Sequence, residues 1–106
     1  MEIPPRIYMR LHSAGGQLIL AACDKHLLGE RLEMGELLFP VSKHFYGGDL
    51  VSDETFLNMI GQVSSANIVG NHCVDLLLDK GIVDRNSVTL IGEVKHVQIY
   101  TIPMGR

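Results

Sequence analysis

The chain has 106 residues, which is enough for one domain with its own hydrophobic core and too short for two ordinary domains. Hydrophobic residues make up 46% of it and charged residues 20%, a balance typical of globular proteins and not of disordered ones. Twelve acidic and nine basic residues give a net charge of −3, which argues against a protein held to nucleic acid mainly by a basic surface. We expect a single domain over residues 1–106, with an ordered core at about residues 6–103.

The cysteines and the apolar runs indicate a reducing, aqueous compartment. Cys23 and Cys73 each lie in an apolar stretch and form no CxxC pair, so buried free thiols are the simplest interpretation. The first five residues show no secretory signal, and the longest apolar run, residues 18–23, is about a third of a membrane span. We therefore expect a cytoplasmic protein with no membrane partner.

The N-terminal half is typical of short strands joined by turns. Residues 7–12 alternate apolar and polar, and after a glycine turn residues 17–23 form a more apolar strand, which together predict a β-hairpin. Residues 24–34 follow neither helix nor strand period, and residues 36–41 predict a short strand. The Phe-Tyr-Gly-Gly stretch at residues 45–48 predicts a loop, because paired glycines adopt φ values that other residues avoid.

Two helices are predicted next. Ser52 is a good N-cap for a helix from residue 53 to about residue 63, with apolar residues spaced i, i+3, i+4 and i+7. Ser64 or Ser65 then caps a second helix that runs to residue 80. Gly70 lies on the inner face of that helix, so we expect a structural role in which it permits a close backbone approach.

The C-terminal part returns to strands. A turn at residues 84–87 precedes predicted strands at residues 88–91 and 97–102, which are separated at Gly92. The order of elements predicts an α+β domain with a largely antiparallel sheet and two helices packed on one face.

Three patterns that resemble catalytic or metal sites are better explained by packing and solvation. Cys23 with His26 has the elements of a nucleophile and base, but Cys23 ends an apolar run and is expected to be a packed thiol. His72 and Asp75 are spaced i, i+3, which favours a solvated pair on a helix surface. The five histidines have no chelating spacing, so we predict no metal site and no cofactor.

Three polar segments are candidates for binding a ligand. Tyr46 beside the amides of Gly47 and Gly48 has the features of a stacking platform that also holds a phosphate; the alternative is a tight turn with a core aromatic. Ser65 and Asn67 at the predicted helix start have exposed amides suited to an anion, although Ser65 is also an ordinary cap.

The third segment is the entry to the last strand. Lys95, His96 and Gln98 there carry groups that contact base edges or phosphates, and a solvated strand edge is the alternative interpretation. The residue types alone do not separate these two readings.

These segments together resemble an archaeal family called domain of unknown function 424. The resemblance rests on residues 45–48, 65–70 and 91–98, is supported by residues 21–24 and 81–84, and extends from about Ile7 to Ile102. It implies a small archaeal cytoplasmic protein, uncharacterised, with a suggested role in RNA binding and no assigned catalytic residue. The family-like polar and glycine positions are Tyr46, Gly47, Gly48, Ser65, Asn67, Gly70, His96 and Gln98. Family members often carry proline at the position of Lys95, so the resemblance gives Lys95 no role.

The leading hypothesis is a non-catalytic RNA-binding domain associated with the translation machinery, with RNA or the ribosome as partner. In it, Tyr46 stacks on a base, the 47–48 backbone and the Ser65/Asn67 helix start hold phosphates, and His96 with Gln98 contacts base edges or ribose. Local charge would come from basic side chains near these segments, namely Arg6, Arg10, Lys43 and Lys95.

Two other classes of function stay open. One is a protein–protein adaptor or a module that forms a homodimer through a helix pair or a sheet edge. The other is an enzyme or small-ligand binder that uses His96 near the Ser65/Asn67 helix start.

Overall fold

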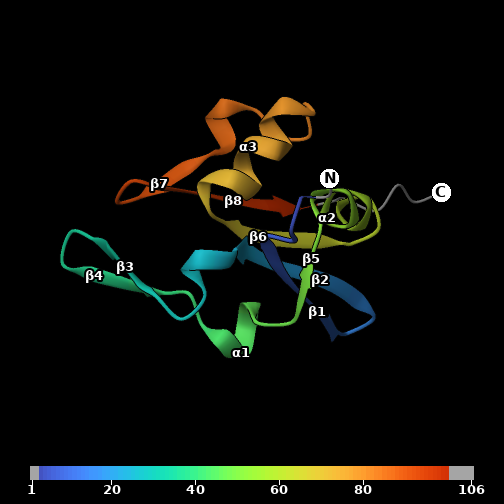
Figure 1. The fold of residues 1–106 in the computed structure, drawn as a ribbon, viewed down its shortest axis with the longest axis horizontal. Coiled ribbons are helices and arrows are strands. Elements are labelled where there is room, and N and C mark those ends of the chain that lie inside the picture. Colours follow the sequence, from blue (N-terminus) through green and yellow to red (C-terminus); the bar gives the residue numbers. More distant parts are fainter. Residues whose placement is uncertain (1–2, 101–106) are drawn as a thin grey trace.

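The computed structural model describes residues 3–100, and six of its strands form one mixed sheet (Figure 1). These strands are β1 (Ile7–Ala14), β2 (Gln17–Asp24), β5 (Asp49–Val51), β6 (Ser65–Val69), β7 (Thr89–Ile91) and β8 (Val94–Tyr100). Their order across the sheet is β5-β1-β2-β6-β8-β7. Every neighbouring pair is antiparallel except β2 and β6, which are parallel.

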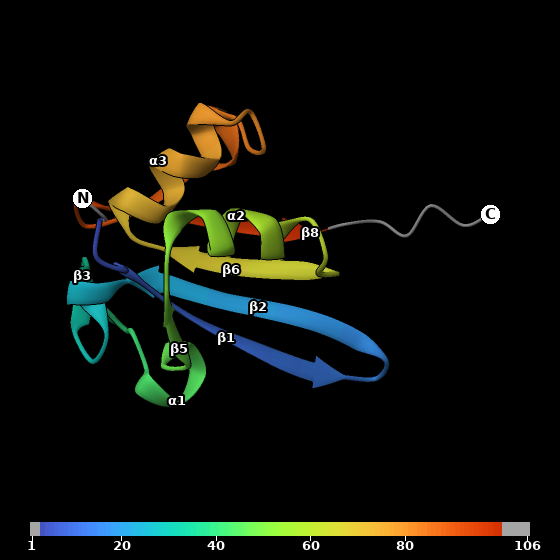
Figure 2. The same ribbon diagram turned by 45° about the vertical axis from the view of Figure 1, so that its right-hand side comes forward.

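The two faces of the sheet have different covers (Figure 2). Helices α2 (Asp53–Ile60) and α3 (Asn71–Asp79) lie on one face. On the other face lie the short helix α1 (Lys43–Tyr46) and the hairpin of β3 (Arg31–Met34) and β4 (Leu37–Pro40), which forms a separate two-stranded sheet. Two short 3-10 helices complete the chain, η1 (Lys25–Leu27) and η2 (Arg85–Ser87).

Two apolar clusters fill the space on either side of the sheet. Because successive side chains of a strand point to opposite faces, β2 supplies both clusters. Leu20 and Ala22 pack with the helix-side cluster, which also contains Phe56 of α2, whereas Ala21 and Cys23 pack with the smaller cluster beneath α1. All five of these residues are fully buried.

The predicted fold class is confirmed, and so are several of its elements. The β1–β2 hairpin, a strand within residues 36–41 and a helix beginning at residue 53 are all present. Ser52 caps α2 as predicted, because its hydroxyl accepts the N–H of Thr55 at 3.2 Å. The two longer helices pack on one face of a sheet in which a single pair is parallel.

Three boundaries were wrong. Residues 65–69 form strand β6 and not the first turns of a helix, because Ala66 and Ile68 face α2 and α3 while Val69 faces the other cluster. Phe45 and Tyr46 belong to α1 and not to a loop, since Ser42 caps a single helical turn there. The last strand begins at residue 94, and residues 101–102 of the predicted strand lie outside the described part.

Between residues 3 and 100, no helix is both long enough and apolar enough to span a lipid bilayer.

Candidate functional site

The face of the sheet that carries α1 is covered at one end and accessible at the other. Two rows of residues cross strands β1, β2, β6 and β8 in register at the accessible end. The outer row is His12, Ile19, Ser65 and Tyr100, and the inner row is Arg10, Ala21, Asn67 and Gln98. The residues of these rows that are exposed or half-buried are here called the open platform: Arg10, His12, Ile19, Ser65, Asn67, Gln98 and Tyr100.

A hydrogen-bonded network at the inner edge of the open platform fixes one amide side chain. The hydroxyl of Tyr46 donates to Oδ1 of Asn67 at 2.7 Å, and Nε2 of His96 lies 3.1 Å from the same oxygen. Because that oxygen only accepts, His96 carries its hydrogen on Nε2 in this arrangement. The NH2 group of Asn67 makes no hydrogen bond with any of residues 3–100, so its two donors are available to a ligand.

Burial favours the neutral forms of the two ionisable side chains in this network, His96 and Tyr46. Burial lowers the pKa of His96, whose ring is half-buried and meets the ring of Phe39 edge-on at 5.4 Å. Burial, followed by the nearby Cys23, raises the pKa of Tyr46, which is only 2% exposed. The network therefore favours neutral side chains that donate and accept hydrogen bonds.

Aromatic rings lie at both ends of the outer row. The ring of His12 stacks on Phe45 of α1, with centroids 4.8 Å apart and planes 13° apart, and its Nε2 donates to the Phe45 carbonyl at 2.8 Å. At the other end Tyr100 is 72% exposed, and its hydroxyl donates to Oε1 of Gln98 at 3.3 Å. An aromatic ring this exposed on a sheet face has a free surface for stacking.

The structure brings together only part of the predicted site. Asn67, His96 and Gln98 share one face of the sheet with Ser65, and Tyr46 contacts Asn67 from α1. Tyr46 is wrong as a stacking residue, however, because its ring is buried. The exposed ring of Tyr100, which the sequence reasoning did not single out, has the accessibility that stacking needs.

The predicted phosphate-holding amides of residues 47 and 48 are wrong as well. The N–H of Gly47 donates to the carbonyl of Lys43 at 2.8 Å, and the N–H of Gly48 donates to the carbonyl of Tyr46 at 3.0 Å. Both amides are therefore already used. The two glycines serve packing instead, since a Cβ on either would overlap a backbone carbonyl, that of Lys43 for Gly47 and that of Met9 for Gly48.

Other residues of the predicted site differ from the prediction in their position or contacts. Ser65 and Asn67 are in β6, where backbone amides belong to the sheet ladder, so there is no Ser65/Asn67 helix start for an anion. Lys95 points to the helix side, where its Nζ pairs with Asp75. Lys43 is exposed on α1 with its stem near Gly29, and it makes no hydrogen bond to the network.

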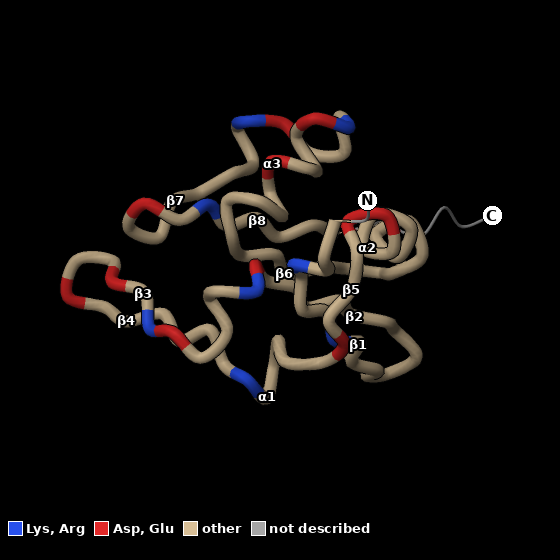
Figure 3. Tube along the Cα trace, in the orientation of Figure 1, with Lys and Arg blue, Asp and Glu red and all other residues tan. Residues whose placement is uncertain are grey.

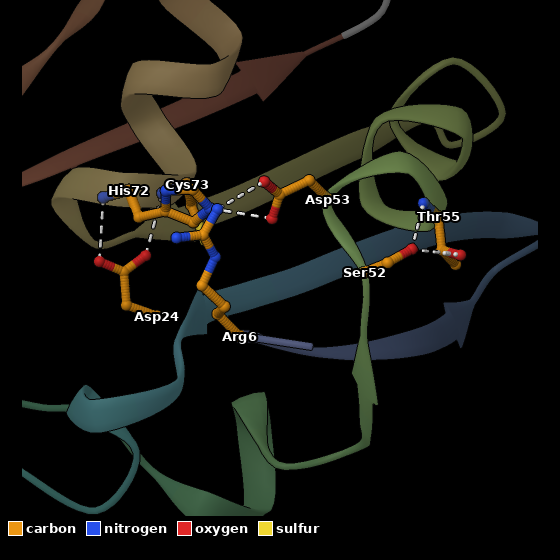
Figure 4. Close-up of polar contacts among 7 residues, drawn as sticks. All are labelled: Arg6, Asp24, Ser52, Asp53, Thr55, His72 and Cys73. Atoms are coloured by element: carbon orange, nitrogen blue, oxygen red, sulfur yellow. Dashed lines mark hydrogen bonds and ion pairs between the residues drawn. The ribbon is translucent and has the colours of Figure 1, made fainter. Parts of the chain in front are cut away.

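A second polar cluster joins the start of α3 to α2 and to the segment before β1 (Figure 4). The carboxylate of Asp24, which is 3% exposed, accepts the backbone N–H groups of His72 at 3.0 Å and Cys73 at 2.9 Å. Nε2 of His72 bonds Oδ1 of Asp53 at 2.9 Å, and Arg6 donates to Oδ2 of Asp53 at 3.1 Å. The predicted His72–Asp75 pair is thus wrong, since His72 reaches α2 instead.

Sequence reasoning missed Asp24 and Gly70 as partners. Gly70 lies between β6 and α3 with φ +131°, and a Cβ there would overlap the carboxylate of Asp24. The contact joins the ends of two strands that are far apart in sequence, so no local pattern contains it. The apolar run that ends in a charged residue at position 24 was the one available signal.

The two thiols are buried and unpaired. Burial, followed by the charge of Asp24, raises the pKa of Cys23 to about 12 and that of Cys73 well above its ordinary value. Cys23 is therefore a packed thiol and not a nucleophile activated by His26. In the described chain, no three His, Cys, Asp or Glu side chains are grouped so that they would hold a metal ion.

The fold and its accessible face define a small α+β domain with one helix-covered side and one polar, partly aromatic side. The family model described as protein of unknown function (DUF424) matches residues 12–102, so the chain belongs to this family. A crystal structure of an uncharacterized conserved protein from Methanopyrus kandleri, an archaeon, has a similar fold. The TM-score is 0.80 at 24% sequence identity, over 95% of this chain and 96% of that one. None of the curated proteins matches the chain.

Proposed function

We propose that this protein is a non-catalytic RNA-binding domain and that the open platform binds unpaired nucleotides. The observation that carries the proposal is the presence of a largely exposed aromatic ring, Tyr100, and a fixed amide donor, Asn67, on one sheet face. Single-stranded RNA is recognised on sheet faces by stacking of bases on aromatic side chains and by hydrogen bonds to base edges.

The dimensions of the open platform suit a short stretch of RNA. His12 and Tyr100 are three strands apart in the same row, which corresponds to about 14 Å at the usual strand spacing. This span accommodates about two or three splayed nucleotides. In the adjacent inner row, Gln98 and the NH2 group of Asn67 would contact the bases, and Arg10 on β1 would contact a phosphate.

The charge of the molecule sets the expected mode of binding. Acidic and basic residues are dispersed along the chain (Figure 3), and the net charge is −3. Few phosphates would be neutralised, so affinity must come from stacking and hydrogen bonding, and its logarithm should fall only shallowly with the logarithm of salt concentration. We further propose that the RNA partner is ribosomal or transfer RNA, which would associate the protein with the translation machinery.

The test is a fluorescence anisotropy titration of labelled single-stranded RNA at two salt concentrations. We expect saturable binding that weakens at least about fivefold in Tyr100→Ala, the loss of one stacked base, and also in Gln98→Ala and Arg10→Ala. The matched controls on the helix side, Gln62→Ala and Arg85→Ala, should bind like the parent protein.

Two results would contradict the proposal. One is the absence of binding at low salt, and the other is binding that Tyr100→Ala leaves unchanged while a control weakens it. Circular dichroism of each variant establishes that the sheet is intact.

A protein-binding role is the second candidate, and the β3–β4 hairpin favours it. Leu37 and Leu38 at its turn are 65% and 58% exposed, which is unusual for two adjacent leucines on a small domain. If these leucines form a contact between two copies, light scattering should show a dimer that Leu37→Ser with Leu38→Ser converts to a monomer. A parent protein that is monomeric at high concentration would rule out this self-association.

The third class considered, an enzyme or small-ligand binder that uses His96 near a helix start, has less support than the other two. The helix start is absent, and the ring of His96 is committed to Asn67 and flanked by Phe39.

A further inference from the structure

A cleft lies at the carboxyl ends of β2 and β6, the one parallel pair in the sheet. Its volume is about 490 Å3, and its walls come from the segment before β1, from η1 and from the first turn of α3. The lining residues besides Asp24 are Pro4, Pro5, Arg6, Lys25, His26 and His72. Crevices at the carboxyl ends of parallel strands are a common place for small ligands, and this volume is within the usual range of such sites.

The amides at the start of α3 are not available to a ligand in this cleft. The carboxylate of Asp24 accepts the N–H groups of His72 and Cys73, so it occupies the position where an anion would bind a helix N-terminus (Figure 4). A ligand must therefore be held by the side chains that line the cleft.

Those side chains include two N–H donors that no described carboxylate pairs with. Arg6 and His72 both bond to the carboxylate of Asp53 at one side of the cleft, so these two side chains already have a partner. The buried carboxylate of Asp24 accepts hydrogen bonds from two backbone amides, so its oxygens face the helix start. Lys25 and His26 remain, both exposed and neither in an ion pair with a described residue.

The remaining wall is apolar. Pro4 and Pro5 are exposed, and their saturated rings give the cleft an apolar surface suited to packing against a planar ring. An anion that is also planar and partly apolar matches both parts of the cleft, whereas inorganic phosphate matches only one.

We propose that this cleft binds a nucleoside monophosphate, with the phosphate at Lys25 and His26 and the nucleoside against the two prolines. The site is separate from the open platform, because it lies at the opposite ends of β2 and β6. The same chemistry is offered by a free nucleotide and by the terminal nucleotide of an RNA, and the two are distinguished below.

The test is isothermal titration calorimetry with adenosine monophosphate, adenosine and inorganic phosphate as separate probes. We expect the monophosphate to bind at least about tenfold more tightly than either fragment, since charge-assisted contacts add to ring packing. Lys25→Gln and His26→Gln should each weaken it by about fivefold or more. Lys80→Gln and His44→Gln, which change exposed residues of the same types outside the cleft, should have no effect.

Equal affinity for adenosine and its monophosphate, or no binding at millimolar concentration, would overturn the proposal. So would monophosphate binding that neither Lys25→Gln nor His26→Gln alters. An RNA oligonucleotide with and without a 5′-phosphate identifies the source: a preference for the phosphorylated end places the site on RNA, and indifference assigns it to the free nucleotide. Tyr100→Ala should leave monophosphate binding unchanged, so failure of the platform proposal and failure of this one are distinguishable.

Discussion

The hydroxyl of Tyr46 donates a 2.7 Å hydrogen bond to Oδ1 of Asn67, which ties helix α1 to the middle of the sheet. The bond gives a buried tyrosine its partner and holds the amide in one orientation. If the open platform binds RNA as proposed, the NH2 group of Asn67 would therefore need no rearrangement to donate to a base. Tyr46, which the sequence analysis assigned to stacking on a base, is thus a positioning residue that orients Asn67.

Removing that hydroxyl should cost stability and ligand affinity together. Tyr46→Phe leaves the ring in the core and deletes one hydrogen bond, so we expect the free energy of unfolding to fall by about 1–2 kcal/mol. RNA affinity should fall a few-fold as the amide of Asn67 gains freedom. Denaturant unfolding and the RNA titration measure the two effects.

Tyr8→Phe is the matched control for this variant. Tyr8 is half-buried on the same sheet face, and its hydroxyl has no hydrogen-bond partner among residues 3–100. Its change should shift stability by less than about 0.5 kcal/mol. Equal effects of the two substitutions would show that the Tyr46–Asn67 bond contributes nothing.

The parts of the fold that could be predicted are those encoded by neighbouring residues. Strands β1 and β2 show alternation around a glycine turn, and α2 shows a cap followed by an apolar stripe. Each of these signals lies within about a dozen residues, so tertiary packing did not need to be known.

The errors arose where distant segments decide the local structure. Residues 65–69 contain two residues that favour caps, Ser65 and Asn67, yet parallel pairing with β2 makes them a strand. The helix can start only after Gly70, because its first free amides are satisfied by Asp24 from the end of β2. The sequence also could not predict which candidate site residues contact one another. The Tyr46–Asn67–His96 network forms only when α1, β6 and β8 are in their final positions.

Gly70 should tolerate no side chain. Its φ of +131° is one that L residues rarely adopt, and a Cβ would overlap the carboxylate of Asp24 that caps α3. We expect Gly70→Ala to lower the free energy of unfolding by at least about 2–3 kcal/mol. Thermal or denaturant unfolding gives the value.

Gly61→Ala provides the comparison. Gly61 ends α2 with φ −76°, and the nearest atom to a Cβ there is 3.8 Å away, so this change should be neutral or stabilising by about 0.5 kcal/mol. If Gly70→Ala is as well tolerated as Gly61→Ala, the proposed steric role of Gly70 is wrong.

The pH dependence of stability should reveal the half-buried imidazole of His96. Burial lowers its pKa, so in acid the unfolded chain binds a proton that the folded protein does not. This contribution to stability is complete above the ordinary histidine pKa of about 6.5 and is lost as pH falls below it, until the folded pKa is reached. The difference in unfolding free energy between the parent protein and His96→Gln should therefore shrink from pH 7.5 to pH 5.5, roughly the interval over which histidine titrates.

Asp53 does not disturb this measurement. Although burial raises its pKa, the hydrogen bonds and charges of His72 and Arg6 lower it on balance. Its contribution to stability is therefore lost only below the ordinary aspartate pKa of about 3.9. A difference between the two proteins that stays constant over the neutral range would contradict the assignment to His96.

The two thiols should be inert in the folded protein. Both cysteines are fully buried, and burial raises the pKa of Cys23 to about 12, so almost no thiolate exists at pH 8. We expect Ellman's reagent to release no colour from the folded chain and to titrate both thiols once denaturant is added. Cys23→Ser and Cys73→Ser variants assign each signal. A folded Cys23 that reacts as fast as free cysteine would show that the thiolate is accessible, and it would restore the pairing with His26 as a nucleophile.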